Sequence, residues 1–242
     1  THNHSEVCNA MIAYLNEINK KPGRKLSTAW LNGLAGIMDA YFGQVPETFT
    51  YEGKSYTPQS FAKSLGLDMN NYMAFTSFSH HPFNKPCGLE VADNWLWGQY
   101  MNVTIQDLKS IVDYAVENGY PVAWGADVSE GGFKWNKGYA VIPEETKESD
   151  LEGTELSRWV TLSAKEKENK RFDIKGPVKE ITVTQESRQK MFDSQETTDD
   201  HGMVIEGYAT DQNGKRYYKI KNSWDDKHIY KGYFYVSEAY FM

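Results

Sequence analysis

A strand–turn–strand pattern near the C-terminus constrains the fold more than any other feature. Residues 202–209 (GMVIEGYA) read as an apolar strand, and residues 216–221 (RYYKIK) alternate as half-buried strands do. Between them, Asp211-Gln-Asn-Gly214 has the composition of a tight hairpin turn. A third segment of this kind, 232–236 (GYFYV), follows. The C-terminal part of the chain is therefore expected to form an antiparallel sheet.

Helical spacing dominates the earlier part of the chain. Helices are expected at 5–19 with Ser5 as N-cap, from 27 to 43, at 104–118 with Thr104 as N-cap, and at 184–192. A strand and then a Pro-started helical turn are expected within 49–61, an irregular stretch at 68–103, and an apolar strand at 121–128. These elements predict the α+β class, with a mainly helical and loop region at 1–120 and a β-rich region at 121–242. A charge-dense, solvated insertion is expected at about 144–175.

Composition excludes several classes of protein. A hydrophobic content of 40% and an aromatic content of 14% are typical of a chain with a packed core and not of a disordered one. The net charge of −7 argues against a nucleic-acid partner, because phosphate binding needs an excess of Lys and Arg. No run of 18 apolar residues predicts a membrane span. We expect a soluble protein, cytoplasmic or exported; since residue 1 is Thr, the compartment stays unassigned.

Two residues on the predicted hairpin have complementary chemistry. His201 enters the first strand and Asn222 leaves the second, so the hairpin should place them side by side at one end of the sheet. A cysteine nucleophile needs a base to become a thiolate, and the imidazolium formed must be held in one orientation. An Asn carbonyl does this without adding charge. Trp224 is expected to cover that hydrogen bond and exclude water.

These motifs resemble the papain superfamily of cysteine peptidases. The resemblance rests on His-Gly at a strand start, followed by Lys221-Asn-Ser-Trp224 and then a Lys-Gly-Tyr sequence. Three further segments are similar to the bleomycin hydrolase (aminopeptidase C) branch: TPQSF at 57–61, PVAWGADV at 121–128 and TDDHGM at 198–203. The resemblance implies a papain-like fold and a cysteine peptidase of the aminopeptidase kind. In it, His201 acts as general base and then acid, and Asn222 orients the ring.

The resemblance also assigns the surroundings of the base. Asp200 and Gly202 flank His201 and would border the substrate cleft, whose occupant is a peptide. Asp225 departs from the family, which usually has Gly after this Trp. The chain also stops at Met242, soon after the last strand, with no segment matching the C-terminal arm that restricts family members to N-terminal cleavage. Aminopeptidase and endopeptidase action therefore both stay open. The family forms ring-like homo-oligomers, which makes a homo-oligomer an expected partner state.

The nucleophile is the main departure from the family. Family members carry a Gln and, several residues later, a Cys-Trp pair at a helix start; no such pattern occurs here. Cys8 lies inside a predicted helix, which is typical of a buried apolar thiol, and Cys87 follows a proline in an aromatic loop. We therefore expect the nucleophile on an upstream segment or a separate light chain of the same precursor. A truncated enzyme, or a homologue that has lost catalysis, would lack this pattern as well.

Two further functions and one metal site are compatible with parts of the sequence. A catalytically inactive peptide-binding homologue would keep the same fold, and an unrelated amide or acyl transferase would use Cys87 with His201. His80, His81 and Cys87 are too few ligands on an irregular loop to predict a metal site. The sequence thus predicts neither a metal nor a cofactor.

Overall fold

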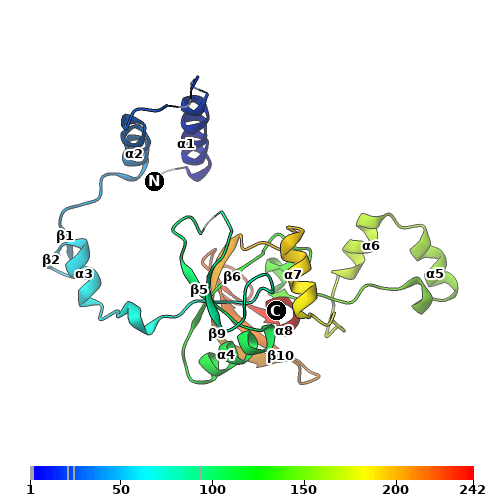
Figure 1. Cartoon of the computed structure of the whole chain (residues 1–242). Helices are drawn as coiled ribbons and strands as arrows, with labels where there is room; N and C mark the ends of the chain where they lie inside the picture. The colour runs from blue at the N-terminus through cyan, green and yellow to red at the C-terminus, as the bar shows by residue number, and fades with distance from the viewer. Residues whose placement is uncertain (1–2, 21, 24, 93) are drawn as a thin grey trace. The chain divides into compact units, whose positions relative to one another are not determined.

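The computed structural model describes residues 3–20, 22–23, 25–92 and 94–242. Internal contacts divide the chain into two compact units, Thr1–Tyr72 and Met73–Met242 (Figure 1). This boundary lies well before residue 120, where the sequence changes from mainly helical to β-rich. Residues 73–120 belong with the second unit because their strands and helix pack with its sheets. None of the described helices is both long and apolar enough to cross a membrane.

The first unit consists of a helical pair, a hairpin and a short helix. Its elements are α1 (His4–Asn19), α2 (Ala29–Phe42), β1 (Phe49–Tyr51), β2 (Lys54–Tyr56), α3 (Pro58–Ser64) and a 3₁₀ turn, η1 (Met69–Asn71). The hydroxyl of Tyr14 on α1 donates to the carbonyl of Trp30 on α2 at 2.9 Å. The expected Ser5 cap is wrong: Asn3 caps α1, since its side chain accepts from the N–H of Glu6 at 3.2 Å.

Residues 49–61 hold two strands where one was predicted. Glu52 and Gly53 both have positive φ, 47° and 75°, and this left-handed pair closes a hairpin between β1 and β2. Each strand has only three residues, which is too short to show a period of two in the sequence. The helix after it starts at Pro58 as predicted, with Thr57 and Ser60 forming a reciprocal capping box.

A six-stranded sheet is the main element of the second unit. Its order is β6-β9-β10-β11-β8-β7, with β6 at Val122–Ala126, β7 at Phe133–Lys134, β8 at Tyr139–Ala140, β9 at His201–Thr210, β10 at Arg216–Lys221 and β11 at Tyr233–Ser237. The predicted antiparallel pairing of β9, β10 and β11 is confirmed. The parallel pairing of β8 with β11 was not predicted, because a two-residue strand leaves no periodic signal.

A smaller three-stranded sheet replaces the irregular stretch expected at 68–103. It has the order β3-β5-β4, with β3 at Phe75–Thr76, β4 at Lys85–Gly88 and β5 at Gln99–Asn102. Asn102 is fully buried and fixes the β3–β4 connection. Its side chain accepts from the N–H of Phe78 at 2.9 Å and donates to the carbonyls of Phe78 and His81, each at 2.9 Å. These side-chain hydrogen bonds hold the connection in one conformation, and sequence periodicity gives no sign of them.

Helices α4 (Ile105–Glu117), α7 (Gln185–Asp193) and α8 (Glu238–Phe241) complete the second unit (Figure 1). The predicted Thr104 cap of α4 is confirmed, and α4 packs against β6 and β9. The core combines apolar side chains of α4 and α8 with those of the central strands: Val112, Val116, Ile205, Tyr218, Ile220, Phe234, Val236 and Phe241. Burying each large apolar side chain contributes about 1.5–3 kcal/mol, so this sheet is the stable frame for its edges.

The charged insertion is exposed, as expected, but it is not structureless. It contains α5 (Gly153–Val160) and α6 (Ala164–Arg171), neither of which has a buried residue. Ser163 and Glu166 form a capping box at the start of α6. The insertion is anchored at its end by Arg171, which donates to the carbonyl of Pro143 at 2.8 Å, and by the buried ring of Phe172.

Candidate active site

The β9–β10 pairing brings His201 and Asn222 together. His201 is the first residue of β9, and Asn222 follows the last residue of β10 directly. The register places Val204 opposite Lys221, so the beginning of one strand lies beside the end of the other. Nε2 of His201 lies 2.9 Å from Oδ1 of Asn222. The predicted neighbourhood of these two side chains is confirmed.

The hydrogen bonds of Asn222 fix the tautomer of His201. The backbone N–H of Ser223 donates to Oδ1 of Asn222 at 2.7 Å, which identifies that atom as the carbonyl oxygen. Because a carbonyl oxygen only accepts, Nε2 of His201 must be the donor and carries the ring proton. In the neutral ring, Nδ1 is then the nitrogen with the lone pair. The basic atom of His201 is therefore Nδ1.

Burial holds Asn222 in place. Its side chain is 7% exposed, and its backbone N–H donates to the carbonyl of Gly232 at 2.9 Å. Gly232 has a φ of +88°, a conformation that glycine adopts without strain. Among the described residues, Nδ2 of Asn222 has no hydrogen-bond partner, although it is buried. An unpaired buried donor costs about 1–3 kcal/mol. The hydrogen bonds of this buried amide are thus made by its oxygen, which accepts from His201 and Ser223.

Trp224 lies against the imidazole, as the sequence predicts. The two ring centroids are 5.0 Å apart with an interplanar angle of 37°. Trp224 is in turn held by two edge-to-face contacts, with Phe133 at 5.7 Å and with Trp135 at 5.2 Å. Trp135 stacks on His228 at 4.0 Å. An aromatic cluster thus lines one side of the base and leaves Trp224 itself 44% exposed.

Asp200 and Gly202 leave the other side of His201 open. Asp200 is exposed, and its Oδ1 accepts from the N–H of Val128 at 3.0 Å, tying the start of β9 to the end of β6. Gly202 pairs with Gly125 across the strands. A Cβ built on Gly202 would meet no atom within 4 Å. Gly202 therefore adds no side chain at this end of the sheet, where β9 lies between β6 and β10.

Two carboxylates that no sequence motif indicates lie just past the end of β6, whose last residue, Ala126, pairs with His201. Asp127 is buried at the end of β6; although burial opposes it, hydrogen bonds from Thr198 and Ser129 lower its pKa. Glu130 accepts from the hydroxyl of Thr197 at 2.6 Å, and burial raises the pKa of its carboxyl. Nearby Asp200 raises it further. Sequence patterns carry no signal for these groups, because they meet only through the β6–β9 pairing.

The two cysteines of the chain lie in different units. Cys8 is on α1 in the first unit, where its sulfur lies 3.6 Å from Nε2 of His4. Cys87 is on β4 and is 7% exposed. Burial, with the nearby charge of Glu90, raises the pKa of the Cys87 thiol, which favours the unreactive protonated form. Among the described residues of the second unit, no hydrogen bond joins the Cys87 thiol to His201.

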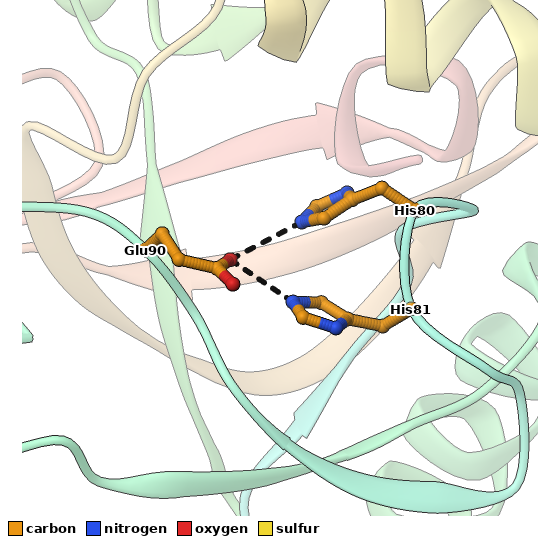
Figure 2. A group of neighbouring side chains, drawn as sticks. All are labelled: His80, His81 and Glu90. Atoms are coloured by element: carbon orange, nitrogen blue, oxygen red, sulfur yellow. Dashed lines mark hydrogen bonds and ion pairs between the residues drawn. The ribbon is translucent and has the colours of Figure 1, made fainter.

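Within the described chain, one group has three side chains of the kind that hold metal ions. It consists of His80, His81 and Glu90 (Figure 2). Cys87, which is close to the two histidines in the sequence, is not part of this group. The third side chain is that of Glu90. The group lies at the small sheet and belongs to neither strand of the His201 hairpin.

Comparison with known proteins finds peptidases to which this chain is similar. Residues 167–242 match the sequence model of the Peptidase C1-like family. Aminopeptidase C of Lactobacillus delbrueckii subsp. lactis is 26% identical over 86% of this chain and 44% of its own length. Aminopeptidase C of Lactobacillus helveticus is 26% identical over 78% of this chain and 36% of its own length. The chain thus spans less than half the length of these curated relatives.

A solved structure supports the same fold. The crystal structure of PepW from Lactobacillus rhamnosis HN001 (DR20) matches with a TM-score of 0.63 and 21% identity, covering 98% of this chain and 52% of that one. The α+β architecture is therefore that of the papain-like peptidases. The C-terminal part of this chain thus matches the Peptidase C1-like family, and the chain as a whole is similar to curated aminopeptidase C proteins. The family expected from the sequence motifs is confirmed.

Proposed function

We propose that this chain carries the base and its orienting group for a cysteine peptidase that acts on peptides. One observation carries the proposal: Asn222 holds Nε2 of His201 at 2.9 Å, which makes Nδ1 the nitrogen that takes a proton. His201 is the general base and then the acid, and Asn222 keeps the ring in one orientation. The names of the curated relatives favour the aminopeptidase kind.

The proposed reaction is acyl transfer through a thioester. A cysteine thiol gives its proton to Nδ1 of His201, and the thiolate adds to the carbonyl carbon of the peptide bond. The imidazolium returns that proton to the leaving nitrogen, so that an amine departs and a thioester remains. A water molecule then gives a proton to Nδ1, attacks the thioester and releases the acid and the thiol. Oδ1 of Asn222 accepts from Nε2–H in every step, which favours the charged ring without adding a second charge.

We place the nucleophile on a segment outside this chain, upstream or on a separate light chain. The raised pKa of Cys87 and its burial in a strand support this placement, because a nucleophilic cysteine needs a lowered pKa. The same observation weakens the transferase alternative that pairs Cys87 with His201. The partners proposed for this chain are the peptide substrate, the segment with the cysteine, and further copies of the chain.

The second candidate is a peptide-binding homologue without catalysis. The unobstructed space at Gly202 would suit this role as well, since a Cβ built there meets no atom within 4 Å. A binding protein would not require a basic Nδ1 on an oriented ring, which is why we favour the peptidase.

Activity of the full-length precursor tests the proposal. We expect it to hydrolyse aminoacyl coumarin amides, and iodoacetamide should inhibit it. His201→Ala should lower kcat/KM by at least about a thousandfold, and Asn222→Ala by about 10–100-fold, because base and orienter contribute in that order. His4→Ala, in the first unit, is the matched control and should leave the rate unchanged. Full activity in His201→Ala would overturn the proposal, while binding of the peptide without turnover would favour the second candidate.

A further inference from the structure

His80, His81 and Glu90 converge on one point. Nε2 of His80 lies 3.3 Å and Nε2 of His81 lies 2.9 Å from the same oxygen, Oε2 of Glu90. All three donor atoms lie within 4.8 Å of one another. Figure 2 shows the two rings side by side, with both Nε2 atoms aimed at the carboxylate. The histidines come from the connection between β3 and β4, and Glu90 comes from the segment after β4.

These spacings suit tetrahedral coordination. Bonds of about 2.0–2.1 Å from zinc to nitrogen or oxygen, at tetrahedral angles, separate neighbouring ligand atoms by about 3.3 Å. The two distances to Oε2 of Glu90 are close to that value, at 2.9 and 3.3 Å. Two imidazoles and one carboxylate also form a ligand set that borderline transition-metal ions prefer to magnesium or calcium.

We propose that His80, His81 and Glu90 form a site for a divalent transition-metal cation, with Zn²⁺ as the best-matched ion. Three protein ligands leave the fourth tetrahedral position for water. The ion would join the β3–β4 connection to the chain that leaves β4. This site stands apart from the His201 hairpin, and the inference does not rest on the proposed peptidase function.

The surrounding structure holds the ligands in place without an ion. Buried Asn102 donates to the carbonyl of His81 at 2.9 Å, which fixes the backbone next to the two rings. The His80 ring is parallel to Phe192 within 9° at 5.7 Å. Little reorganisation of the ligands is required for binding.

Gln189 sets one condition for the site. Its Nε2 lies 3.0 Å from Nδ1 of His80, while its Oε1 accepts from the N–H of Ser79 at 2.6 Å. The amide therefore donates to Nδ1, and the metal-free ring carries its proton on Nε2. Coordination through Nε2 moves this proton to Nδ1, where an acceptor would support the bound ring better than an amide N–H does. Gln189 thus weakens the site but does not block it.

Zinc titration of the full chain tests the inference. After chelator treatment, isothermal titration calorimetry with ZnCl₂ should show one site. His81→Ala and the isosteric Glu90→Gln should each weaken it at least about tenfold, since each removes a ligand. The double variant His4→Ala/Cys8→Ser is the control, because it removes a His–Cys pair on α1 whose ring nitrogen and sulfur lie 3.6 Å apart. Circular dichroism checks that each variant is folded, and Glu90→Gln keeps the shape if His81→Ala does not fold.

The inference would be overturned if the native chain did not bind zinc, or if Glu90→Gln left the binding unchanged. Loss of binding in His4→Ala/Cys8→Ser alone would likewise assign the ion to α1. Gln189→Glu combined with Asp193→Asn supplies a carboxylate acceptor for Nδ1–H of His80 and keeps the partner that Gln189 now has in Asp193. This variant should bind zinc more tightly, and weaker binding would contradict ligation by His80.

Discussion

The side-chain amide of Asn222 is fixed by two separate groups. The N–H of Ser223 and the Nε2–H of His201 both point at Oδ1, at 2.7 and 2.9 Å. Neither distance depends on a bound nucleophile, so the ring orientation is a property of the hairpin itself. On the proposed function, the chain would present an already oriented His201 to a thiol from another segment.

His201 and Asn222 were predictable from the sequence for a physical reason. Both residues sit at the ends of strands joined by a recognisable turn, and the strand alternation fixes the register that brings them together. Trp224 was predictable because it belongs to the same Lys-Asn-Ser-Trp motif as Asn222. Glu130 and Asp127 were not, since they reach Thr197 and Thr198, just before β9, through the pairing of β6 with β9 across more than half of the β-rich region.

Glu130 gives a pH-dependent prediction at this scale. Burial raises the pKa of its carboxyl above the ordinary value of 4.5, and the charges of Asp127, Glu196 and Asp200 raise it further. Folding therefore favours the protonated form. The stability gained is complete below the unfolded pKa and is lost as pH rises through the folded pKa. At neutral pH the charged Glu130 thus destabilises the native state.

Glu130→Gln should raise Tm at pH 7.5, because the neutral amide keeps an oxygen that accepts from Thr197 and loses the buried charge. The gain should shrink as pH falls and vanish below about pH 4.5. Thermal unfolding followed by circular dichroism between pH 4 and 8 measures it. Glu47→Gln, at an exposed position, serves as the comparison and should give no pH-dependent gain. A lower Tm for Glu130→Gln at pH 7.5 would contradict the argument.

Among the secondary-structure elements, the aromatic cluster behind Trp224 is built by short pieces that sequence patterns miss. Phe133 begins β7, a strand of two residues, and Trp135 begins the 3₁₀ turn η2 (Trp135–Lys137). Neither element is long enough to show a period. His228 closes the cluster: it stacks on Trp135 and also contacts the Trp135 carbonyl through Nε2. These contacts are long-range, which is why the sequence predicted Trp224 but not what holds it.

Trp135→Ala tests this element. The substitution removes the edge-to-face contacts with Trp224 and Phe234 and the stacking on His228. We expect a loss of about 2–3 kcal/mol in the free energy of unfolding, below the roughly 3–5 kcal/mol typical of a fully buried Trp, because Trp135 is only half-buried. Urea unfolding of the full chain measures the loss. Trp95→Ala, at a side chain that is 75% exposed, should change stability by less than about 0.5 kcal/mol. Equal effects of the two variants would refute the role of the cluster.

Across the whole molecule, the two units differ in how much apolar surface they bury. The second unit contains the sheet core around Tyr218 and Phe234, both almost fully buried. Among the described residues of the first unit, only Val7 is buried. Several of its large apolar side chains are exposed, with Leu31 at 56% and Phe42 at 55%. Sequence spacing predicted the helices of this unit but not this difference, because periodicity shows which face is apolar and not whether a partner covers it.

This difference predicts that the second unit folds without the first. Residues 73–242, produced alone, should unfold cooperatively in urea and keep the hydrogen bond between His201 and Asn222, visible in the ¹⁵N chemical shifts of the imidazole. Residues 1–72 should show no cooperative transition, because burying one valine cannot offset the backbone entropy of ordering about seventy residues. The full chain, studied in parallel, gives the reference shifts. Aggregation or non-cooperative melting of 73–242 would show that its core needs the first unit, and a sharp transition in 1–72 would show that the exposed helical faces find a partner in solution.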